Sequence, residues 1–381
     1  MSKPPAVMFV SSHARLGGAE EYLLRLLGEL GSEWIEGVVC LEQGPFVERL
    51  RAAGIPAAVI PTPARPPGIF RSAAKLRRAV LRAQPDLVHA NGVKAATLCA
   101  AALLGTSVPF LWLKHDFSWD GPLARAVGRR AVQIVGVSAA VTGTFRGGTR
   151  RKVHVVHNGL AELSVDREEG RRRLLAAFGE PAPEQIISLV ARIDPYKGHR
   201  ELLEILPRLR VHFPRLRLAF IGGEHAPHLE FAARLRDDIA ALGLDEAVVF
   251  TGFRGDAVEL MAGSDVVVMP STVDDRTGMG GEGFPYVGLE AMAVGTPIAG
   301  YAEGGLPELV GDCGRLVRPG DRSALREAIL EILRDPGLHE RLAACGSERV
   351  RTQFSLDAMV AKMKERYRDA AGTMIGRDGG S

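Results

Sequence analysis

The stretch "QIISLVARIDPYKG" at residues 185–198 decides the fold. It begins with an apolar run, continues with a short polar loop that carries two cations, and ends on a glycine that opens a helical pattern. An almost wholly apolar run of this length is typical of a strand that is covered on both faces of its sheet. A strand followed by a loop and a helix is the repeating unit of a parallel sheet with crossover helices.

The same alternation extends towards both ends of the chain. Strands are predicted at 6–10, 37–41, 57–60, 87–89, 109–114, 133–137 and 153–157, and then at 185–190, 217–221, 248–251, 265–269, 297–300 and 314–317. Helical patterns lie between most of them, whereas the proline-rich stretch 61–68 is predicted to be a loop. The fold class is therefore α/β.

A chain of 381 residues is too long for one ordinary core, and it predicts two domains that face a cleft. The alternation stops before residue 165 and restarts at 185–198. We therefore predict one Rossmann-like domain over 1–165 and a second over 166–354. Helices are expected at 321–334, 336–347 and 355–371, followed by a disordered tail at 372–381.

Composition narrows the class of protein. Hydrophobic residues make up 46% of the chain and charged residues 24%, which is typical of a soluble globular enzyme. No apolar run approaches the roughly 18 residues of a membrane-spanning helix, so we expect a cytoplasmic protein. Cys40, Cys99, Cys313 and Cys345 are far apart and form no CxxC pair. This spacing predicts buried, unreactive thiols, with neither a zinc site nor a disulfide framework.

Charge is unevenly spread along the chain. Residues 1–165 contain 20 Lys and Arg against 11 Asp and Glu, whereas the remaining residues contain 28 against 34. Two basic clusters contribute to this excess, namely Arg71, Lys75, Arg77, Arg78 and Arg82 on one predicted helix, and Arg146, Arg150, Arg151 and Lys152 further on. Such clusters can hold a protein peripherally at the inner face of a membrane or against an acidic acceptor. A solvated surface is the plainer alternative.

Three loops after predicted strands carry candidate ligand-binding residues, because ligands of open α/β sheets bind beyond the carboxyl ends of the strands. Gly17 and Gly18 stand at the start of a helix, where free amides suit an anion, although a tight turn explains two glycines equally well. Arg192 and Lys197 suit a diphosphate, and the alternative is two surface charges. His115 ends an apolar strand, where a lone histidine is more often structural.

The stretch "GEGFPYVGLEAMAVGTP" at 281–297 places Glu282 and Glu290 eight residues apart. The carboxylates of a glycosidase pair lie about 5 to 9.5 Å apart, whereas eight residues along a helix rise about 12 Å. We therefore predict two grips on one ligand that has a polyol at each end, as a nucleotide sugar has. Arg192 and Lys197 would then hold the diphosphate between the two ends.

The combination of "GGAE", "ARIDPYKG", "GFRGDAVELMAGSDVVVMPS", "EGFPYVGLEAMAVGTP" and "GGLPELV" resembles the retaining glycosyltransferases of family 4, also called group 1, which have the GT-B fold. The resemblance covers nearly the whole chain. It implies that Arg192 and Lys197 bind the diphosphate, that Glu282 contacts the donor sugar, and that Glu290 holds the ribose. It also implies a place near the donor sugar for His115, and donor-binding roles for Gly17, Gly18, Phe253 and Arg254 and for the backbone of Gly283, Phe284 and Pro285.

The resemblance further implies an activity. A hexose-type sugar would pass, with retention of configuration, from a nucleotide diphosphate sugar with a UDP or GDP carrier to an acceptor hydroxyl. The acceptor would be a glycan, a lipid-linked molecule or a small molecule, in the biosynthesis of a glycan, a glycolipid or a glycosylated metabolite. No cofactor, metal or nucleic acid is implied, so Asp274 and Asp275 are expected to be solvated rather than to bind a metal.

Three other classes of function are alternatives for this chain. A nicotinamide dehydrogenase would also contain Rossmann-like sheets, but no GxGxxG follows a strand in this chain. A phosphorylase or a sugar epimerase with the same fold is a second alternative, and a phosphorylase would incorporate free phosphate. A catalytically silent binding module is the third, although the charged residues of the predicted site are all present.

Overall fold

The computed structural model describes residues 3–63, 66–118, 120–224, 226–273 and 280–375. The chain divides into two compact units. Unit 1 comprises Met1–Gly159 together with Leu356–Ser381, and unit 2 comprises Leu160–Ser355. The division after Gly159 falls six residues before the position that the sequence pattern predicted, and the last helix is grouped with the first unit.

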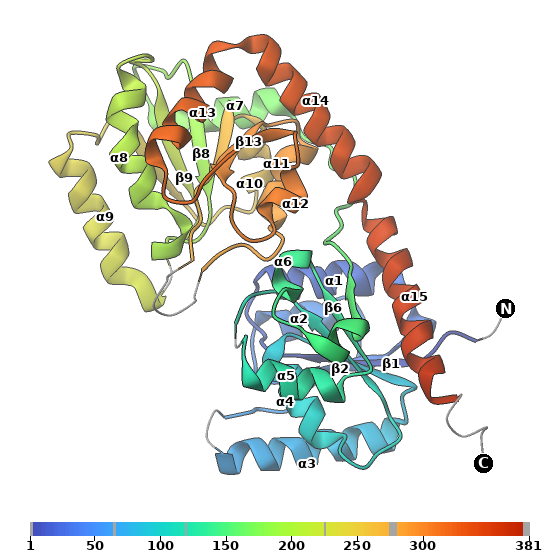
Figure 1. Cartoon of the computed structure of the whole chain (residues 1–381). Helices are drawn as coiled ribbons and strands as arrows, with labels where there is room; N and C mark the ends of the chain where they lie inside the picture. Colours follow the sequence, from blue (N-terminus) through green and yellow to red (C-terminus); the bar gives the residue numbers. More distant parts are fainter. Residues whose placement is uncertain (1–2, 64–65, 119, 225, 274–279, 376–381) are drawn as a thin grey trace. The chain divides into compact units, whose positions relative to one another are not determined.

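Unit 1 is built on a seven-stranded sheet with the order β3-β2-β1-β4-β5-β6-β7, and all its strand pairs are parallel (Figure 1). Its elements, with 3-10 helices written η, are β1 (Val7–Ser11), α1 (Gly18–Leu30), η1 (Ser32–Trp34), β2 (Ile35–Cys40), α2 (Pro45–Ala52), β3 (Ala57–Val59), α3 (Pro66–Ala83), β4 (Leu87–Asn91), α4 (Val93–Ala102), β5 (Phe110–Lys114), α5 (Pro122–Arg130), β6 (Gln133–Gly136), α6 (Ala139–Thr142), η2 (Gly147–Lys152), β7 (Val153–Val155) and α15 (Leu356–Ile375).

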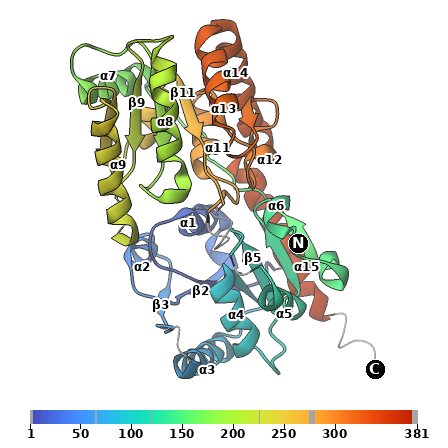
Figure 2. The same cartoon turned by 60° about the vertical axis from the view of Figure 1, so that its left-hand side comes forward.

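Unit 2 is built on a six-stranded parallel sheet with the order β10-β9-β8-β11-β12-β13. Its elements are α7 (Arg167–Phe178), β8 (Ile186–Val190), η3 (Pro195–Lys197), α8 (His199–Arg210), β9 (Arg217–Ile221), η4 (Ala226–His228), α9 (Leu229–Ala241), β10 (Val248–Gly252), α10 (Ala257–Ala262), β11 (Val266–Met269), α11 (Tyr286–Ala293), β12 (Ile298–Tyr301), α12 (Leu306–Val310), β13 (Gly314–Val317), α13 (Arg322–Arg334) and α14 (Pro336–Gln353). Helices α8 and α9 run side by side (Figure 2).

Each sheet buries apolar side chains on both faces, because successive strand residues point to opposite sides. In β8, Ile187 packs with the helices α8, α9 and α13, whereas its neighbour Ile186 packs with α7 and α10. In β1, Val10 packs with α3 and α4, whereas Phe9 contacts Tyr367 of α15. Because both faces are buried, the strands could be recognised in the sequence as continuous apolar runs.

Every strand predicted from the sequence is present, with ends that differ by two residues at most. Three predictions at helix ends were wrong. Helix α14, predicted over 336–347, continues to Gln353. Helix α3 begins at Pro66, inside the stretch predicted as a loop, because proline is tolerated in a first helical turn whose amides lack partners in any case. Helix α15 continues through Ile375 into the predicted tail. The rest of that tail, from 376 on, lies outside the described residues.

The prediction of four free thiols was also wrong. Cys313, in the turn before β13, and Cys345, on α14, form a disulfide with a Cα–Cα distance of 5.2 Å. The two residues are 32 positions apart, a spacing that carries no signal in the sequence. Cys40 and Cys99 are free and buried as predicted, and burial raises the pKa of the Cys40 thiol to about 12.

Helix α15 is held on unit 1 by a buried polar contact. Tyr367 and His89 are both fully buried, and the Tyr367 hydroxyl lies 2.6 Å from His89 Nδ1. Around them, Phe9 and Trp34 complete an aromatic cluster against α15. Burial lowers the pKa of His89 to about 3, so its ring is neutral at physiological pH.

We expect Tyr367→Phe to lower the free energy of unfolding of unit 1 by about 1 to 3 kcal/mol, because it leaves His89 Nδ1 buried without a hydrogen-bond partner. Urea unfolding measures this change. Tyr196→Phe is the matched control, since the partly exposed Tyr196 hydroxyl has no hydrogen-bond partner among the described residues, and it should change stability little. Equal stability of the two variants would contradict a stabilising role for the hydrogen bond between Tyr367 and His89.

Candidate functional site

The strand order changes direction at one place in each sheet. In unit 2, the chain continues from β8 to β9 on one side, whereas β11 lies on the other side. In unit 1, β1 separates β2 from β4 in the same way. Loops that leave neighbouring strands in opposite directions open a crevice at the carboxyl ends of those strands. The loops after β8 and β11, and those after β1 and β4, are therefore the candidate ligand-binding loops.

The crevice of unit 2 contains an ion pair between two predicted site residues. Lys197 Nζ, from the loop after β8, lies 2.6 Å from Glu282 Oε1, from the loop after β11. Ser271, directly beyond β11, donates its hydroxyl to the same oxygen at 2.8 Å. The side chains of Lys197 and Glu282 are 25% and 15% exposed, so the pair is sheltered yet open to a ligand. Both contacts use Oε1, and Glu282 Oε2 has no partner among the described residues.

Backbone contacts hold these two loops together. The Thr272 amide donates to the Tyr196 carbonyl at 3.0 Å. Gly198 has a φ of +81°, and a Cβ atom there would lie 2.5 Å from the carbonyl oxygen of Pro270. Only glycine fits this backbone conformation and this close approach without strain. The glycine that was expected to open a helix therefore fixes Lys197 against the β11 loop, and α8 begins one residue later.

Arg192 occupies the same loop as Lys197 but is exposed, and it contacts no other described residue by a hydrogen bond or ion pair. The neighbouring Ile193 is buried and its amide donates to the Gly223 carbonyl at 3.0 Å, which fixes the backbone beside Arg192. The guanidinium is thus attached to a fixed backbone while its donors remain available to a ligand.

The premise behind the spacing of Glu282 and Glu290 was wrong. Helix α11 begins only at Tyr286, so the first half of this stretch is not helical and the rise of eight helical residues does not apply. Glu290 lies on α11 and is partly exposed. That the two carboxylates hold different parts of one ligand stays a prediction.

The residues between them have structural roles. Phe284 is 4% exposed and packs against Phe354 at a ring-centroid distance of 5.2 Å, so only its backbone can face a ligand. Pro285 is the N-cap residue of α11. The Glu282 carbonyl accepts a hydrogen bond of 2.7 Å from the Gly305 amide, in the "GGLPELV" stretch. This contact fixes the backbone that carries the Glu282 carboxylate.

Phe253 and Arg254 follow β10 at the same edge of the sheet. Phe253 is 86% exposed, which leaves its ring open for stacking. Arg254 makes two hydrogen bonds to Asp256, at 2.7 and 2.6 Å. These bonds, with the one from Arg173, hold the pKa of Asp256 well below its usual range. Arg254 is therefore already engaged, and a ligand would have to share it with Asp256.

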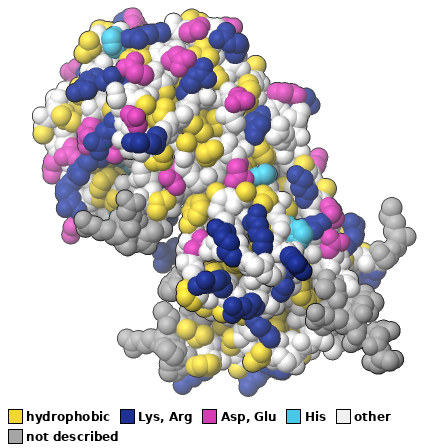
Figure 3. Space-filling model, viewed as in Figure 1, with side chains coloured by type: hydrophobic (Ala, Val, Ile, Leu, Met, Phe, Trp, Pro, Cys, Tyr) yellow, Lys and Arg dark blue, Asp and Glu magenta, His cyan; other side chains and the backbone are white. Residues whose placement is uncertain are grey.

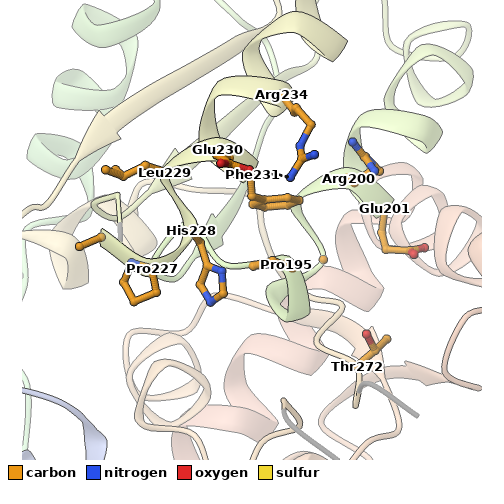
Figure 4. Close-up of a pocket in the computed structure, with 12 residues that line it drawn as sticks. Pro195, Arg200, Glu201, Pro227, His228, Leu229, Glu230, Phe231, Arg234 and Thr272 are labelled. Carbon is orange, nitrogen blue, oxygen red and sulfur yellow. Dashed lines mark ion pairs between the residues drawn. The ribbon is translucent and has the colours of Figure 1, made fainter. Parts of the chain in front are cut away.

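A pocket of about 730 Å³ lies next to these loops, between the starts of α8 and α9 (Figure 4). Its wall includes Pro195, Arg200, His228, Phe231 and Thr272. None of these was predicted from the sequence as a ligand-binding residue. His228 and Phe231 follow a different strand, β9, and approach the site only in the fold. Pro195 and Thr272 belong to the same loops as Lys197 and Glu282, so the pocket adjoins the ion pair without including it.

The crevice of unit 1 begins with the glycines after β1. Gly17 is the N-cap residue of α1, and a Cβ there would lie 3.2 Å from Glu20 Oε2, because the Glu20 carboxylate folds back over the helix start. Burial raises the pKa of Glu20 to about 7. A Cβ at Gly18 would meet nothing within 4 Å. Packing therefore gives no reason for a glycine at 18, and the space above it is open to a ligand.

His115 lies beyond β5 and is oriented by Asn91, the last residue of β4. The Asn91 side-chain amide donates to the Ala19 carbonyl at 3.2 Å, so its oxygen faces His115 Nε2 at 2.6 Å. Nε2 consequently donates, and Nδ1 of the neutral ring is an acceptor. Burial, and the nearby Lys114 cation, lower the pKa of His115 to about 4 although Asp116 opposes them. Lys114 is itself buried and pairs with Asp120 at 2.9 Å.

His115 and Asn91 line a pocket of about 570 Å³ in unit 1. Its lining includes polar side chains at the strand ends, such as Ser12, and apolar residues such as Ile69 of α3, Leu98 of α4 and Leu123 of α5. The sequence suggested His115 but not the apolar lining, since three separate helices contribute to it.

The described residues contain neither a membrane-spanning helix nor a cluster of metal ligands. Within them, no helix combines the length and the apolar character that crossing a bilayer demands. Nor do three or more His, Cys, Asp or Glu side chains of the described ranges converge as metal ligands do. Asp274 and Asp275 lie outside those ranges.

Family profiles match both halves of the chain. The profile for glycosyl transferases group 1 matches residues 171–349, and the profile for glycosyltransferase family 4 matches residues 16–161. The chain belongs to this glycosyltransferase family. The order of the two profiles follows the two units, with the group 1 profile spanning β8, β11 and both glutamates of unit 2.

Solved structures of similar shape have the GT-B fold of this family. Anabaena HepE in complex with UDP superimposes with a TM-score of 0.83 at 24% identity, over 96% of this chain and 100% of that one. Sucrose-phosphate synthase from Thermosynechococcus elongatus gives a TM-score of 0.76 at 20% identity, over 96% and 98%. The fold of this glycosyltransferase chain is therefore GT-B.

Characterised relatives are similar over part of their length. A 2-deoxystreptamine N-acetyl-D-glucosaminyltransferase of Streptomyces fradiae is 30% identical over 61% of this chain. A GDP-mannose-dependent alpha-(1-6)-phosphatidylinositol monomannoside mannosyltransferase of Mycolicibacterium smegmatis is 35% identical, also over 61%. The matched region spans 53% and 61% of the two relatives' own lengths.

We expect His115 to make unit 1 of this glycosyltransferase chain acid-sensitive. Folded His115 has a pKa of about 4 against a reference value of 6.5, so the unfolded chain binds more protons between these values. The free energy of unfolding should fall as pH drops through this window, by at most about 1.4 kcal/mol per pH unit for one group. Urea unfolding from neutral pH towards pH 4 measures the slope. His115→Gln, which can still donate to Asn91, should make this pH dependence less steep. An unchanged slope would show that His115 does not cause the acid sensitivity.

Proposed function

We propose that the chain is a retaining glycosyltransferase that needs no metal and no cofactor. It would move a hexose-type sugar from a nucleotide diphosphate sugar, with a UDP or GDP carrier, to an acceptor hydroxyl. The acceptor would be a glycan, a lipid-linked molecule or a small molecule, and the reaction would take place in the cytoplasm. The observation that carries the proposal is the contact between Lys197 and Glu282 at the carboxyl ends of β8 and β11.

The contact supports the proposal because a nucleotide sugar needs both a cation for its diphosphate and a carboxylate for its hydroxyls. Lys197 and Arg192 stabilise the negative charge that develops on the diphosphate as it leaves. Glu282 Oε1 keeps Lys197 and Ser271 in position, while Oε2 accepts hydrogen bonds from hydroxyls of the donor sugar. Glu290 holds the ribose, and the exposed ring of Phe253 stacks on the base.

The chemical step then needs no side-chain base. Departure of the nucleotide diphosphate leaves positive character on the anomeric carbon. The acceptor hydroxyl attacks from the face that the leaving group vacates, so configuration is retained, and an oxygen of the leaving phosphate takes the proton. His115 is neutral at physiological pH and its Nε2 proton is directed to Asn91. It therefore acts as a hydrogen-bonding group near the donor sugar.

Two similar proteins support the choice of donor. Anabaena HepE was crystallised with UDP and with UDP-glucose, and the Mycolicibacterium smegmatis relative is named as GDP-mannose-dependent. The relatives' names include an aminocyclitol and a phosphatidylinositol acceptor. Both small and lipid-linked acceptors are therefore represented among similar proteins.

A panel of nucleotide sugars tests the proposal. Purified protein is incubated with each donor in the presence of EDTA, and release of the nucleotide diphosphate is followed. Glu290→Gln should weaken binding of the free nucleotide diphosphate by about tenfold or more, because a charge-assisted hydrogen bond is lost. Glu282→Gln is the matched substitution and should reduce turnover while changing nucleotide diphosphate affinity little.

Two outcomes would overturn these assignments. If no donor is bound or turned over, and Arg192→Ala, Lys197→Ala and Glu290→Ala leave nucleotide binding unchanged, the function is wrong. If Glu290→Gln abolishes turnover without changing affinity, the roles of the two glutamates are reversed.

Gly18→Ala separates ligand binding from folding. The added methyl group meets no protein atom within 4 Å, and alanine favours a helix more than glycine does, so thermal stability should be equal or slightly higher. The same methyl group stands where the donor phosphates would approach the α1 amides, so kcat/KM for the donor should fall by about tenfold or more. Gly28→Ala, on α1 with equally open space, is the matched control and should leave kcat/KM unchanged. Equal kinetics for the two variants would place the donor elsewhere.

A further inference from the structure

The outward face of α3 combines cations with large apolar side chains. No Asp or Glu occurs between Glu48 and Asp86, a stretch that includes the whole helix. Phe70 is 74% exposed and Leu81 is 49% exposed. We use the name α3 surface for the exposed residues Phe70, Arg71, Ala74, Lys75, Arg78, Leu81 and Arg82 of this helix, together with Leu104.

The helical repeat separates this surface from the buried side of α3. At roughly 100° per residue, the exposed residues of the helix fall within one arc of about 140°, with Phe70 and Leu81 on one edge and the cations beside them. Leu76 and Val80 lie on the opposite side and belong to the core of unit 1. The exposed face is therefore a second amphipathic face, and no described part of unit 1 covers it.

The turn that carries Leu104 is fixed to α3 by a cation. Arg77 donates to the carbonyls of Ala102 and Leu104, at 3.1 and 2.7 Å. The Leu104 side chain is 62% exposed. Three of the large exposed apolar side chains of unit 1 thus belong to one helix and the turn that it fixes. Large exposed apolar side chains beside a row of Lys and Arg are typical of helices that lie at a membrane interface.

The basic region of α5 and η2, which includes most of the second cluster, has a different composition. Arg125, Arg129, Arg146, Arg150 and Arg151 are exposed on and between α5 and η2. Figure 3 shows Lys and Arg side chains gathered over this part of unit 1. No Asp or Glu occurs between Asp120 and Glu162. Among the large hydrophobic side chains, only Leu123, at 38%, is exposed in the described part of this segment. Cations without apolar side chains beside them are satisfied by water and counterions. This region by itself therefore does not indicate a binding partner.

We propose that unit 1 docks on an anionic lipid bilayer through the α3 surface. The cations meet the negative surface potential of the lipid head groups, while Phe70, Leu81 and Leu104 enter the boundary between head groups and acyl chains. A polar acidic partner, such as an anionic glycan, would pair with the cations but would offer no apolar surface on which to bury these side chains. Electrostatic attraction to the head groups and insertion of the apolar side chains act together, as stable peripheral binding requires.

Helix α3 borders both the docking surface and the pocket of unit 1, on different sides of the helix. Ile69 lines that pocket, and Phe70, the next residue of α3, belongs to the docking surface. An acceptor carried by the same bilayer would therefore be presented about one helix width from the pocket. This consequence rests on the proposed function, whereas docking itself does not.

Sedimentation of the full chain with vesicles tests the docking. Binding is expected to vesicles that mix phosphatidylglycerol with phosphatidylcholine, to be at least tenfold weaker with phosphatidylcholine alone, and to weaken as salt rises. The variant with Arg71, Lys75, Arg78 and Arg82 all changed to Gln should bind the anionic vesicles at least tenfold less. The double variant Phe70→Ser/Leu81→Ser should also bind less, while its residual binding keeps the salt dependence.

A matched variant controls for net charge. It changes Arg125, Arg129, Arg150 and Arg151 to Gln, which removes the same number of cations from the α5 and η2 region. It should keep most of the binding of the unchanged protein. Equal losses in the two fourfold variants, no loss in the Phe70→Ser/Leu81→Ser variant, or equal binding to both kinds of vesicle would each overturn the proposal.

The side chains in all three variants are exposed, so their circular dichroism spectra and thermal unfolding should match those of the unchanged protein. Donor turnover in vesicle-free solution separates the two proposals. A protein that turns over a nucleotide sugar but ignores vesicles refutes the docking alone. One that binds vesicles but turns over no donor refutes the transferase function alone.

Discussion

All-parallel pairing is the constraint on which both candidate crevices depend. Parallel strands cannot be joined by tight turns, so every connection must cross a face of the sheet, and such crossovers are right-handed. When the chain starts in the middle of a sheet and builds outwards in two directions, the helices on the two sides of the starting point must lie on opposite faces. The loops beyond β8 and β11 then part from one another, as do those beyond β1 and β4. Lys197 and Glu282 meet because of this geometry, although 85 residues separate them.

The same constraint explains what the sequence could predict. Strands that are buried on both faces must be apolar throughout, and so β8 and β9 stand out from the helices around them without any knowledge of the fold. Loop residues at strand ends could be proposed as ligand-binding, since parallel strands bring all such ends to one edge. This reasoning located Lys197, Glu282 and His115 at the edges where the structure places them.

Features that depend on contacts between distant segments could not be predicted. The disulfide between Cys313 and Cys345 requires the turn before β13 to lie against α14, which no local pattern reveals. The pocket between α8 and α9 combines residues that follow different strands. The prediction of a loop at Pro66 failed for another reason, because proline occurs both in loops and in the first turn of helices. The distance argument for Glu282 and Glu290 failed because it required a helix to begin four residues earlier than α11 does.

For individual loop residues, a role in folding can be distinguished from a role in ligand binding. Gly198 is required by its positive φ and by its approach to Pro270, so the fold alone accounts for it. Phe284 is likewise accounted for by its burial against Phe354. Gly18, in contrast, has empty space where its side chain would be, and the ring of Phe253 is 86% exposed. Folding gains nothing from either feature, because a larger residue at 18 and a polar one at 253 would be tolerated. A ligand at the edge of the unit 1 sheet would use the space at Gly18, and a ligand at the edge of the unit 2 sheet would use the Phe253 ring.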